Sequence, residues 1–128
     1  MSATLGLYIH VPFCRTRCRY GDFYRVGENP ARQASFLAAL HREIVGTTEF
    51  HGQRVDTVFF GGGRPALLAP ALIAAVLDHL REVFLFAPEV EVTAECNPSD
   101  LNPERLAGLR AAGLNRLSFG VQSFCDRE

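Results

Sequence analysis

Lysine and tryptophan are both absent from this chain of 128 residues. All 13 basic residues are arginines, and 14 acidic residues bring the formal net charge to −1. This balance provides no general positive field, so we expect no nucleic-acid partner. Positive charge gathers locally at Arg15, Arg17 and Arg19, which form either a solvated loop or a site that attracts an anionic ligand.

Long hydrophobic runs are lacking as well. No apolar stretch approaches the ~18 residues that a membrane-spanning helix needs. The first residues, Met-Ser-Ala-Thr, do not begin the basic, apolar and small-residue pattern of a secretion signal. We therefore expect a cytoplasmic protein without a membrane span. Four cysteines in that setting are more typical of metal ligands or buried thiols than of a disulfide framework.

Segments rich in β-branched and aromatic residues alternate with segments of helical spacing. The predicted strands are 5–10, 55–60, 90–95 and 116–120, and the predicted helices are 31–45, 70–84 and 103–112. Asn102 is expected to cap the start of the third helix and Gly113 its end. The order βαβαβαβ predicts an α/β fold of about four parallel strands and three helices, joined by right-handed crossovers.

Ligands of such folds collect at the carboxyl ends of the strands. The unusual residues of this chain all follow predicted strands: Cys14, Cys18, Gly61, Gly62, Gly63, Glu95, Cys96, Gln122 and Cys125. Because an eight-unit barrel takes about 250 residues, we expect residues 1–128 to be one incomplete domain, a partial barrel truncated after its fourth strand. The open sheet edge is then expected to meet the remainder of the barrel or a second copy of the chain.

The loop after the first predicted strand reads like an iron–sulfur site with one ligand missing. Cys14 and Cys18 are four residues apart, and Gly21 stands where a third cysteine would complete C-x3-C-x2-C. Thiolates are the ligands that iron–sulfur clusters require, and glycine has no side chain that binds iron. His10 also forms an H-x3-C-x3-C spacing with the two cysteines, which suits zinc, although a fourth ligand is not evident.

With these segments placed, the chain resembles the N-terminal part of radical S-adenosylmethionine proteins. Within them it is most similar to the oxygen-independent coproporphyrinogen III oxidase-like group, which includes HemW-type heme chaperones. The matching stretches are Tyr8-Ile-His-Val-Pro-Phe-Cys14, Cys18-Arg-Tyr-Gly21-Asp-Phe-Tyr24, Val55-Asp-Thr-Val-Phe-Phe-Gly-Gly-Gly63, Glu95-Cys-Asn-Pro98 and Asn115-Arg-Leu-Ser-Phe-Gly-Val-Gln-Ser-Phe124. The resemblance implies a 4Fe-4S cluster with Cys14 and Cys18 among its ligands, and S-adenosylmethionine as cofactor.

The resemblance also implies which residues touch S-adenosylmethionine or lie near the cluster. These are Tyr8, Tyr20, Gly62, Gly63, Arg64, Glu95 and Gln122. The related proteins usually follow the glycines with Thr-Pro, whereas Arg64-Pro65 stands here, and we expect the arginine either beside the sulfonium or turned to solvent. Since Gly21 replaces a cluster cysteine, we expect impaired radical generation, unless Cys96 or Cys125 supplies the missing thiol.

Three functions follow from the resemblance. The first is a heme chaperone, which Asp22 favours because the known oxidases usually carry a further cysteine at that position. The second is an enzyme that oxidatively decarboxylates the propionates of coproporphyrinogen, and the third is an inactive fragment. Heme or a porphyrinogen is accordingly the expected partner. The remaining polar candidates are interpreted as surface or helix-start residues: His41, His51, His79, Asp100 and Glu104.

Overall fold

The computed structural model describes residues 4–12 and 30–119. The described strands are β1 (Thr4–Val11), β2 (Arg54–Gly62), β3 (Leu85–Cys96) and β4 (Arg116–Phe119), and the helices are α1 (Pro30–Gly46), α2 (Pro70–Val83) and α3 (Pro103–Ala112). Short 3-10 turns lie at η1 (Thr48–Phe50), η2 (Pro65–Leu67) and η3 (Pro98–Asp100). All strand pairs are parallel and the sheet order is β1-β2-β3-β4. The predicted α/β fold with four parallel strands and three helices is confirmed.

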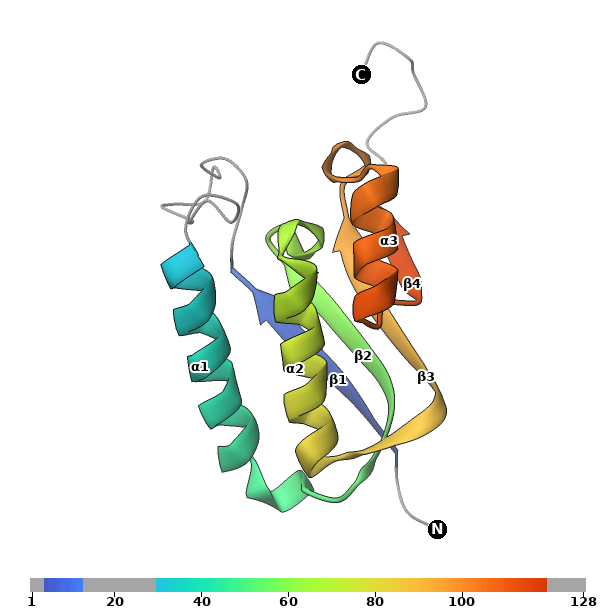
Figure 1. The fold of residues 1–128 in the computed structure, drawn as a ribbon. Helices are drawn as coiled ribbons and strands as arrows, with labels where there is room; N and C mark the ends of the chain where they lie inside the picture. Colours follow the sequence, from blue (N-terminus) through green and yellow to red (C-terminus); the bar gives the residue numbers. More distant parts are fainter. Residues whose placement is uncertain (1–3, 13–29, 120–128) are drawn as a thin grey trace.

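The three helices lie side by side on one face of the sheet (Figure 1). The central helix, α2, carries apolar residues at helical spacing, and five of them are buried: Leu72, Ile73, Val76, Leu77 and Leu80. They meet the buried side chains Val55, Val58 and Phe60 of β2. Burial of a side chain of this size stabilises the fold by about 1.5–3 kcal/mol. The contact between α2 and β2 is therefore a large part of the hydrophobic core.

The element boundaries agree closely with those expected from the sequence at α3. The Asn102 side chain accepts a hydrogen bond from the backbone N–H of Arg105 at 2.7 Å, and Gly113 has a φ of +127° just beyond the last turn. Strand β3 begins earlier than predicted, at Leu85. The stretch Ala87-Pro88-Glu89 suggests a turn, but a register shift after Val55 lets the strand continue around it.

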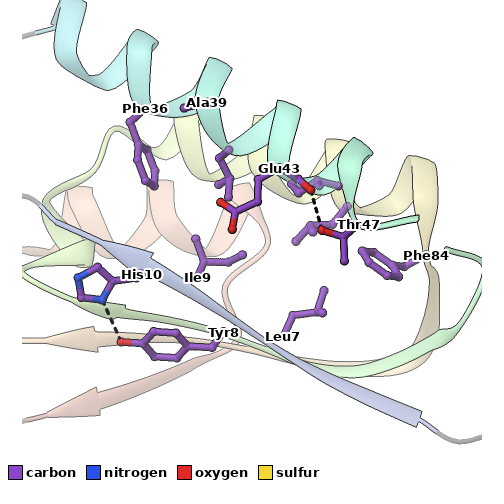
Figure 2. A pocket seen from close by; sticks show the side chains of 12 residues that line it. Leu7, Tyr8, Ile9, His10, Phe36, Ala39, Glu43, Thr47 and Phe84 are labelled. Atoms are coloured by element: carbon purple, nitrogen blue, oxygen red, sulfur yellow. Dashed lines mark hydrogen bonds between the residues drawn. The ribbon is translucent and has the colours of Figure 1, made fainter. Parts of the chain in front are cut away.

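Helix α1 is packed more loosely than α2. Among residues 31–46 only Ile44 is buried. A cavity of about 370 Å³ lies between the helix and β1, with Phe36 and Ala39 on the helix side and Leu7 and Ile9 on the strand side (Figure 2). Within the described part of the chain, no helix has the length and hydropathy to cross a membrane.

Candidate cofactor site at the carboxyl edge of the sheet

Three strands bring Tyr8, Gly61 and Glu95 to one spot near their carboxyl ends. His10 of β1 pairs with Gly61 of β2, and Glu95 of β3 pairs with Ser118 of β4. A Cβ atom at Gly61 would lie 2.5 Å from Glu95 Oε1 and 2.6 Å from the Tyr8 hydroxyl oxygen. The absence of a side chain at Gly61 therefore provides the space in which the carboxylate and the phenol approach each other.

The next two glycines fold the chain against the end of β1. Gly62 has a φ of +105°, in the region that favours glycine, and a Cβ atom there would lie 2.6 Å from the carbonyl oxygen of Val11. The backbone N–H of Gly63 donates a hydrogen bond to the same oxygen at 2.6 Å. The sequence predicts that these glycines allow the backbone to approach a neighbour closely at the end of a strand. In the structure, Gly62 and Gly63 lie against the end of β1 in this way.

A pocket of about 300 Å³ opens beside this edge. Its lining residues are Gly63, Arg64, Glu95, Cys96, Asn97, Ser118 and Phe119. The Glu95 side chain is half-buried, and its carboxylate has no hydrogen-bond or ion-pair partner among residues 4–12 and 30–119. An unpaired carboxylate at a pocket wall can accept hydrogen bonds from an ammonium group or from ribose hydroxyls.

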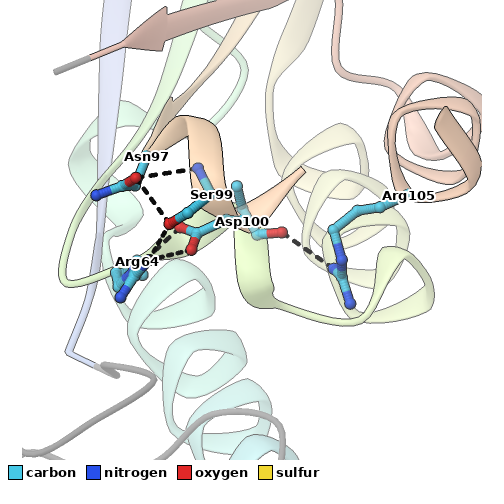
Figure 3. Close-up of polar contacts among 6 residues, drawn as sticks. Arg64, Asn97, Ser99, Asp100 and Arg105 are labelled. Atoms are coloured by element: carbon cyan, nitrogen blue, oxygen red, sulfur yellow. Dashed lines mark hydrogen bonds and ion pairs between the residues drawn. The ribbon is translucent and has the colours of Figure 1, made fainter. Parts of the chain in front are cut away.

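The Arg64 guanidinium, from a residue that lines the pocket, contacts Asp100. Its Nε donates to Asp100 Oδ2 at 3.0 Å, and its Nη2 donates to Asp100 Oδ1 and, at 3.2 Å, to Ser99 Oγ (Figure 3). The Asp100 side chain is completely buried and that of Arg64 is 24% exposed. From the sequence, Arg64 is expected either beside the sulfonium or turned to solvent, and its ion pair with Asp100 is not predicted. A buried carboxylate requires such a partner.

Further hydrogen bonds fix the two segments that carry Arg64 and Asp100. Asn97 Oδ1 accepts from the backbone N–H and from the hydroxyl of Ser99, at 3.1 and 2.9 Å (Figure 3). Arg105 of α3 donates to the carbonyl oxygens of Ala66 and Leu68, at 3.0 and 3.1 Å. The segments that follow β2 and β3, which form two walls of the pocket, are therefore tied to each other and to α3.

Cys96 is a buried thiol at the end of β3. Its Sγ donates to the carbonyl oxygen of Ala94 at 3.3 Å. Burial, together with the nearby charges of Asp100 and Glu95, raises the pKa of Cys96 to about 11, against a smaller opposing effect of a backbone hydrogen bond at Ser118. Since the thiolate is the form that binds metals, a protonated Cys96 is a poor substitute for the missing cluster cysteine.

Several predicted site residues fall outside the part of the chain that the structure describes. These are Cys14, Cys18, Tyr20, Gly21, Gln122 and Cys125. His41 and His79, interpreted from the sequence as surface residues, stack their rings with centroids 3.9 Å apart, and the His41 side chain is 42% exposed. His51 is half-buried, with its Nε2 3.0 Å from the carbonyl oxygen of Ile44. Periodicity alone could not reveal these contacts, since each joins different elements.

The fold, the glycine run and the carboxylate at the strand ends define an α/β domain with a candidate ligand site at the carboxyl edge of its parallel sheet. The family model described as the Radical SAM superfamily matches residues 8–127, and the chain belongs to this superfamily. The resemblance inferred from its motifs is thereby confirmed.

Within this superfamily, the chain is similar to heme chaperones of the HemW type and to oxygen-independent coproporphyrinogen III oxidases. The chain is 42% identical over 129 residues to a protein of Mycobacterium tuberculosis named heme chaperone HemW, covering 95% of this chain and 32% of the relative. It is 36% identical over 125 residues to the oxygen-independent coproporphyrinogen III oxidase of Bradyrhizobium diazoefficiens, covering 95% and 28%. Among solved structures, coproporphyrinogen III oxidase (HemN) from Escherichia coli, titled a radical SAM enzyme, is similar with a TM-score of 0.81 and 36% identity, covering 98% and 30%. The chain thus spans about a third of the length of these relatives.

Proposed function

We propose that this chain is the S-adenosylmethionine-binding part of a HemW-type heme chaperone. The observation that carries the proposal is the convergence at Gly61 of the Tyr8 hydroxyl and of the Glu95 carboxylate, which has no partner among the described residues, beside a pocket at the carboxyl edge of the sheet. The relatives named HemW, together with Asp22 at the position where the oxidases usually carry a further cysteine, favour the chaperone over the enzyme.

The described residues fit S-adenosylmethionine. In this proposal Glu95 accepts hydrogen bonds from the ammonium or ribose hydroxyls of the cofactor, and the bare backbone of Gly62 and Gly63 lies against its methionine part. The ion pair between Arg64 and Asp100 fixes the wall on which that backbone runs. When bound to a reduced cluster, the cofactor supplies a 5'-deoxyadenosyl radical.

The iron–sulfur cluster fits this chain less well. Cys14 and Cys18 supply two thiolates, and Gly21 supplies none in the third position. Burial raises the pKa of the Cys96 thiol and so disfavours the thiolate that a cluster needs. The proposed function therefore rests on cofactor and heme binding, and no radical step is assigned to this chain.

Cofactor binding is tested by Gly61→Ala, with Gly46→Ala as the matched control. The new methyl group at residue 61 meets the ends of the Glu95 and Tyr8 side chains, which can rotate away, so the fold is kept while the site is disturbed. At Gly46 nothing lies within 4 Å of a new Cβ atom. Loss of one hydrogen bond to a charged group corresponds to about tenfold weaker binding. Calorimetric titration with S-adenosylmethionine should show this loss for Gly61→Ala only, and equal affinities would contradict the assigned site.

Heme binding separates the chaperone from its alternative. Titration with heme should give a saturable change in the heme absorption band at one equivalent. The alternative, an oxygen-independent coproporphyrinogen III oxidase, is favoured by the similarity to the Escherichia coli structure and predicts loss of propionate carboxylates from coproporphyrinogen. Decarboxylation without stable heme binding would replace the proposed function by that enzyme.

A further inference from the structure

Three potential metal ligands meet on the helical face of the molecule. They are His41 of α1 and His79 and Glu82 of α2. One ligand atom from each residue lies within 4.8 Å of the other two. His41 Nε2 is 4.0 Å from Glu82 Oε2, and the two imidazole rings are nearly parallel, at an interplanar angle of 19°.

The helical geometry explains why these side chains meet. His79 and Glu82 are three residues apart, so they lie on the same face of α2. Helix α1 runs beside α2 (Figure 1), which brings His41 against that face. Both histidines belong to the carboxyl-terminal halves of their helices, away from the strand ends that carry the glycine run. The cluster is therefore separate from the cofactor site.

A second observation concerns the same histidine of α2. The Nδ1 atom of His79 is buried and has no hydrogen-bond partner within residues 4–12 and 30–119. A buried polar atom is normally paired, and an unpaired one in a native protein calls for a partner such as a water or an ion. Of the buried side-chain nitrogen and oxygen atoms in the described residues, this one alone lacks a partner.

We propose that His41, His79 and Glu82 form a binding site for Zn²⁺. Two imidazole nitrogens and one carboxylate oxygen are a common zinc set, with water in the fourth position. Tetrahedral ligands at zinc distances lie about 3.3 Å apart, so the cluster must contract around the ion. Because an imidazole nitrogen binds a metal in the plane of its ring, the His41 ring must also turn out of the stack with His79. The His41 and Glu82 side chains are 42% and 64% exposed, and both can rotate to bring their ligand atoms to the ion.

The metal would join α1 to α2. Helix α1 needs such a link more than α2 does, because it buries one side chain among residues 31–46 and lies over a cavity of about 370 Å³. It also begins directly after the segment that contains Cys14 and Cys18 in the sequence. Zinc binding is therefore expected to stabilise the attachment of the helix that follows the cysteine loop.

Titration with zinc chloride tests the proposal. Cys14 and Cys18 are first replaced by serine, since these thiols would themselves bind zinc. In that background we expect one Zn²⁺ per chain. Binding should be at least about tenfold weaker in each of His41→Ala, His79→Ala and Glu82→Gln, because even the loss of a residue that only supports a metal ligand weakens metal binding by about that factor. His51→Gln removes an imidazole outside the cluster and serves as the control.

A second measurement separates specific binding from loss of fold. Circular dichroism should show that all variants retain their helices, and Zn²⁺ should raise the melting temperature of the parent but not of His79→Ala. Chelation should reverse the increase. If the parent shows no saturable binding, or if His41→Ala and His79→Ala bind zinc as the parent does, the site does not exist and the rings are stacked for packing alone.

Discussion

Replacing Arg64 with methionine is expected to lower the free energy of unfolding by about 3 kcal/mol. The substitution keeps a long apolar stem and removes the guanidinium. Asp100, whose side chain is completely buried, then loses the cation that contacts both of its carboxylate oxygens. A buried charge left without its partner is among the few single changes that cost a protein this much.

The size of the effect follows from the exposure of the two partners. Breaking a buried ion pair on one side costs about 3–5 kcal/mol. The Arg64 side chain is 24% exposed, so water reaches part of the site and the lower end of that range applies. A loss of 3 kcal/mol corresponds to a fall in melting temperature of about 10 °C for a domain of this size.

A double-mutant cycle tests the reasoning. Urea unfolding of Arg64→Met, Asp100→Leu and the double variant gives the coupling energy between the two sites. The double variant should be more stable than Arg64→Met, because it removes the charge along with its partner. Arg54→Met is the control, since Arg54 pairs at the surface with Asp56 and Glu89 and should cost less than about 1 kcal/mol. A loss below 1 kcal/mol for Arg64→Met, or no coupling, would refute the role assigned to the pair.

Three further predictions concern other parts of the chain. Anaerobic reconstitution with iron and sulfide should give more bound iron and stronger absorption near roughly 400 nm for Gly21→Cys than for the parent; a stable cluster in both would mean that another thiol completes it, and a cluster in neither would mean that the chain lacks the part of the fold that supports the site. The raised pKa of Cys96 means that the unfolded thiol ionises near pH 9 while the folded one stays protonated to about 11, so the free energy of unfolding should fall across that interval, by up to about 2–3 kcal/mol; if Cys96→Ala falls as steeply, the slope has another origin. Gly113→Ala should lower stability by more than about 1 kcal/mol, because the φ of +127° disfavours alanine and the new Cβ atom would lie 2.7 Å from Leu77 Cδ1, whereas Gly46→Ala, measured by the same thermal unfolding, should leave it nearly unchanged.

Much of the fold could be predicted from local patterns. The apolar spacing from Leu72 to Leu80 indicates a helix buried on one face, and Asn102 and Gly113 mark the two ends of α3, where the structure has them. Strand β3 begins at Leu85, before the predicted start at residue 90, and Pro88 lies within it. Whether the strand continues past it depends on pairing with β2, which local pattern does not contain.

The site residues could be predicted from the sequence only where a recognisable motif lies at the end of a predicted strand. Gly61 and Glu95 lie near the carboxyl ends of β2 and β3, and parallel pairing brings them together. The ion pair of Arg64 with Asp100 joins residues 36 apart, and neither residue alone signals the other. The same holds for His41 and His79, whose contact depends on how two helices lie against each other. Contacts between elements of distant sequence are therefore the part that required the structure.

The sheet order β1-β2-β3-β4 has a consequence for how the chain acquires its fold. Each strand pairs with the one before it in the sequence, so no pairing within the described sheet waits for a later segment to insert between two earlier ones. Domains generally fold from the N-terminus as they are synthesised. Asn115 positions the last strand. Its side chain accepts a hydrogen bond from the backbone N–H of Val92 and donates one to the carbonyl oxygen of Val90, which sets the register at which β4 pairs with β3. The sheet can thus be assembled on the ribosome one strand at a time.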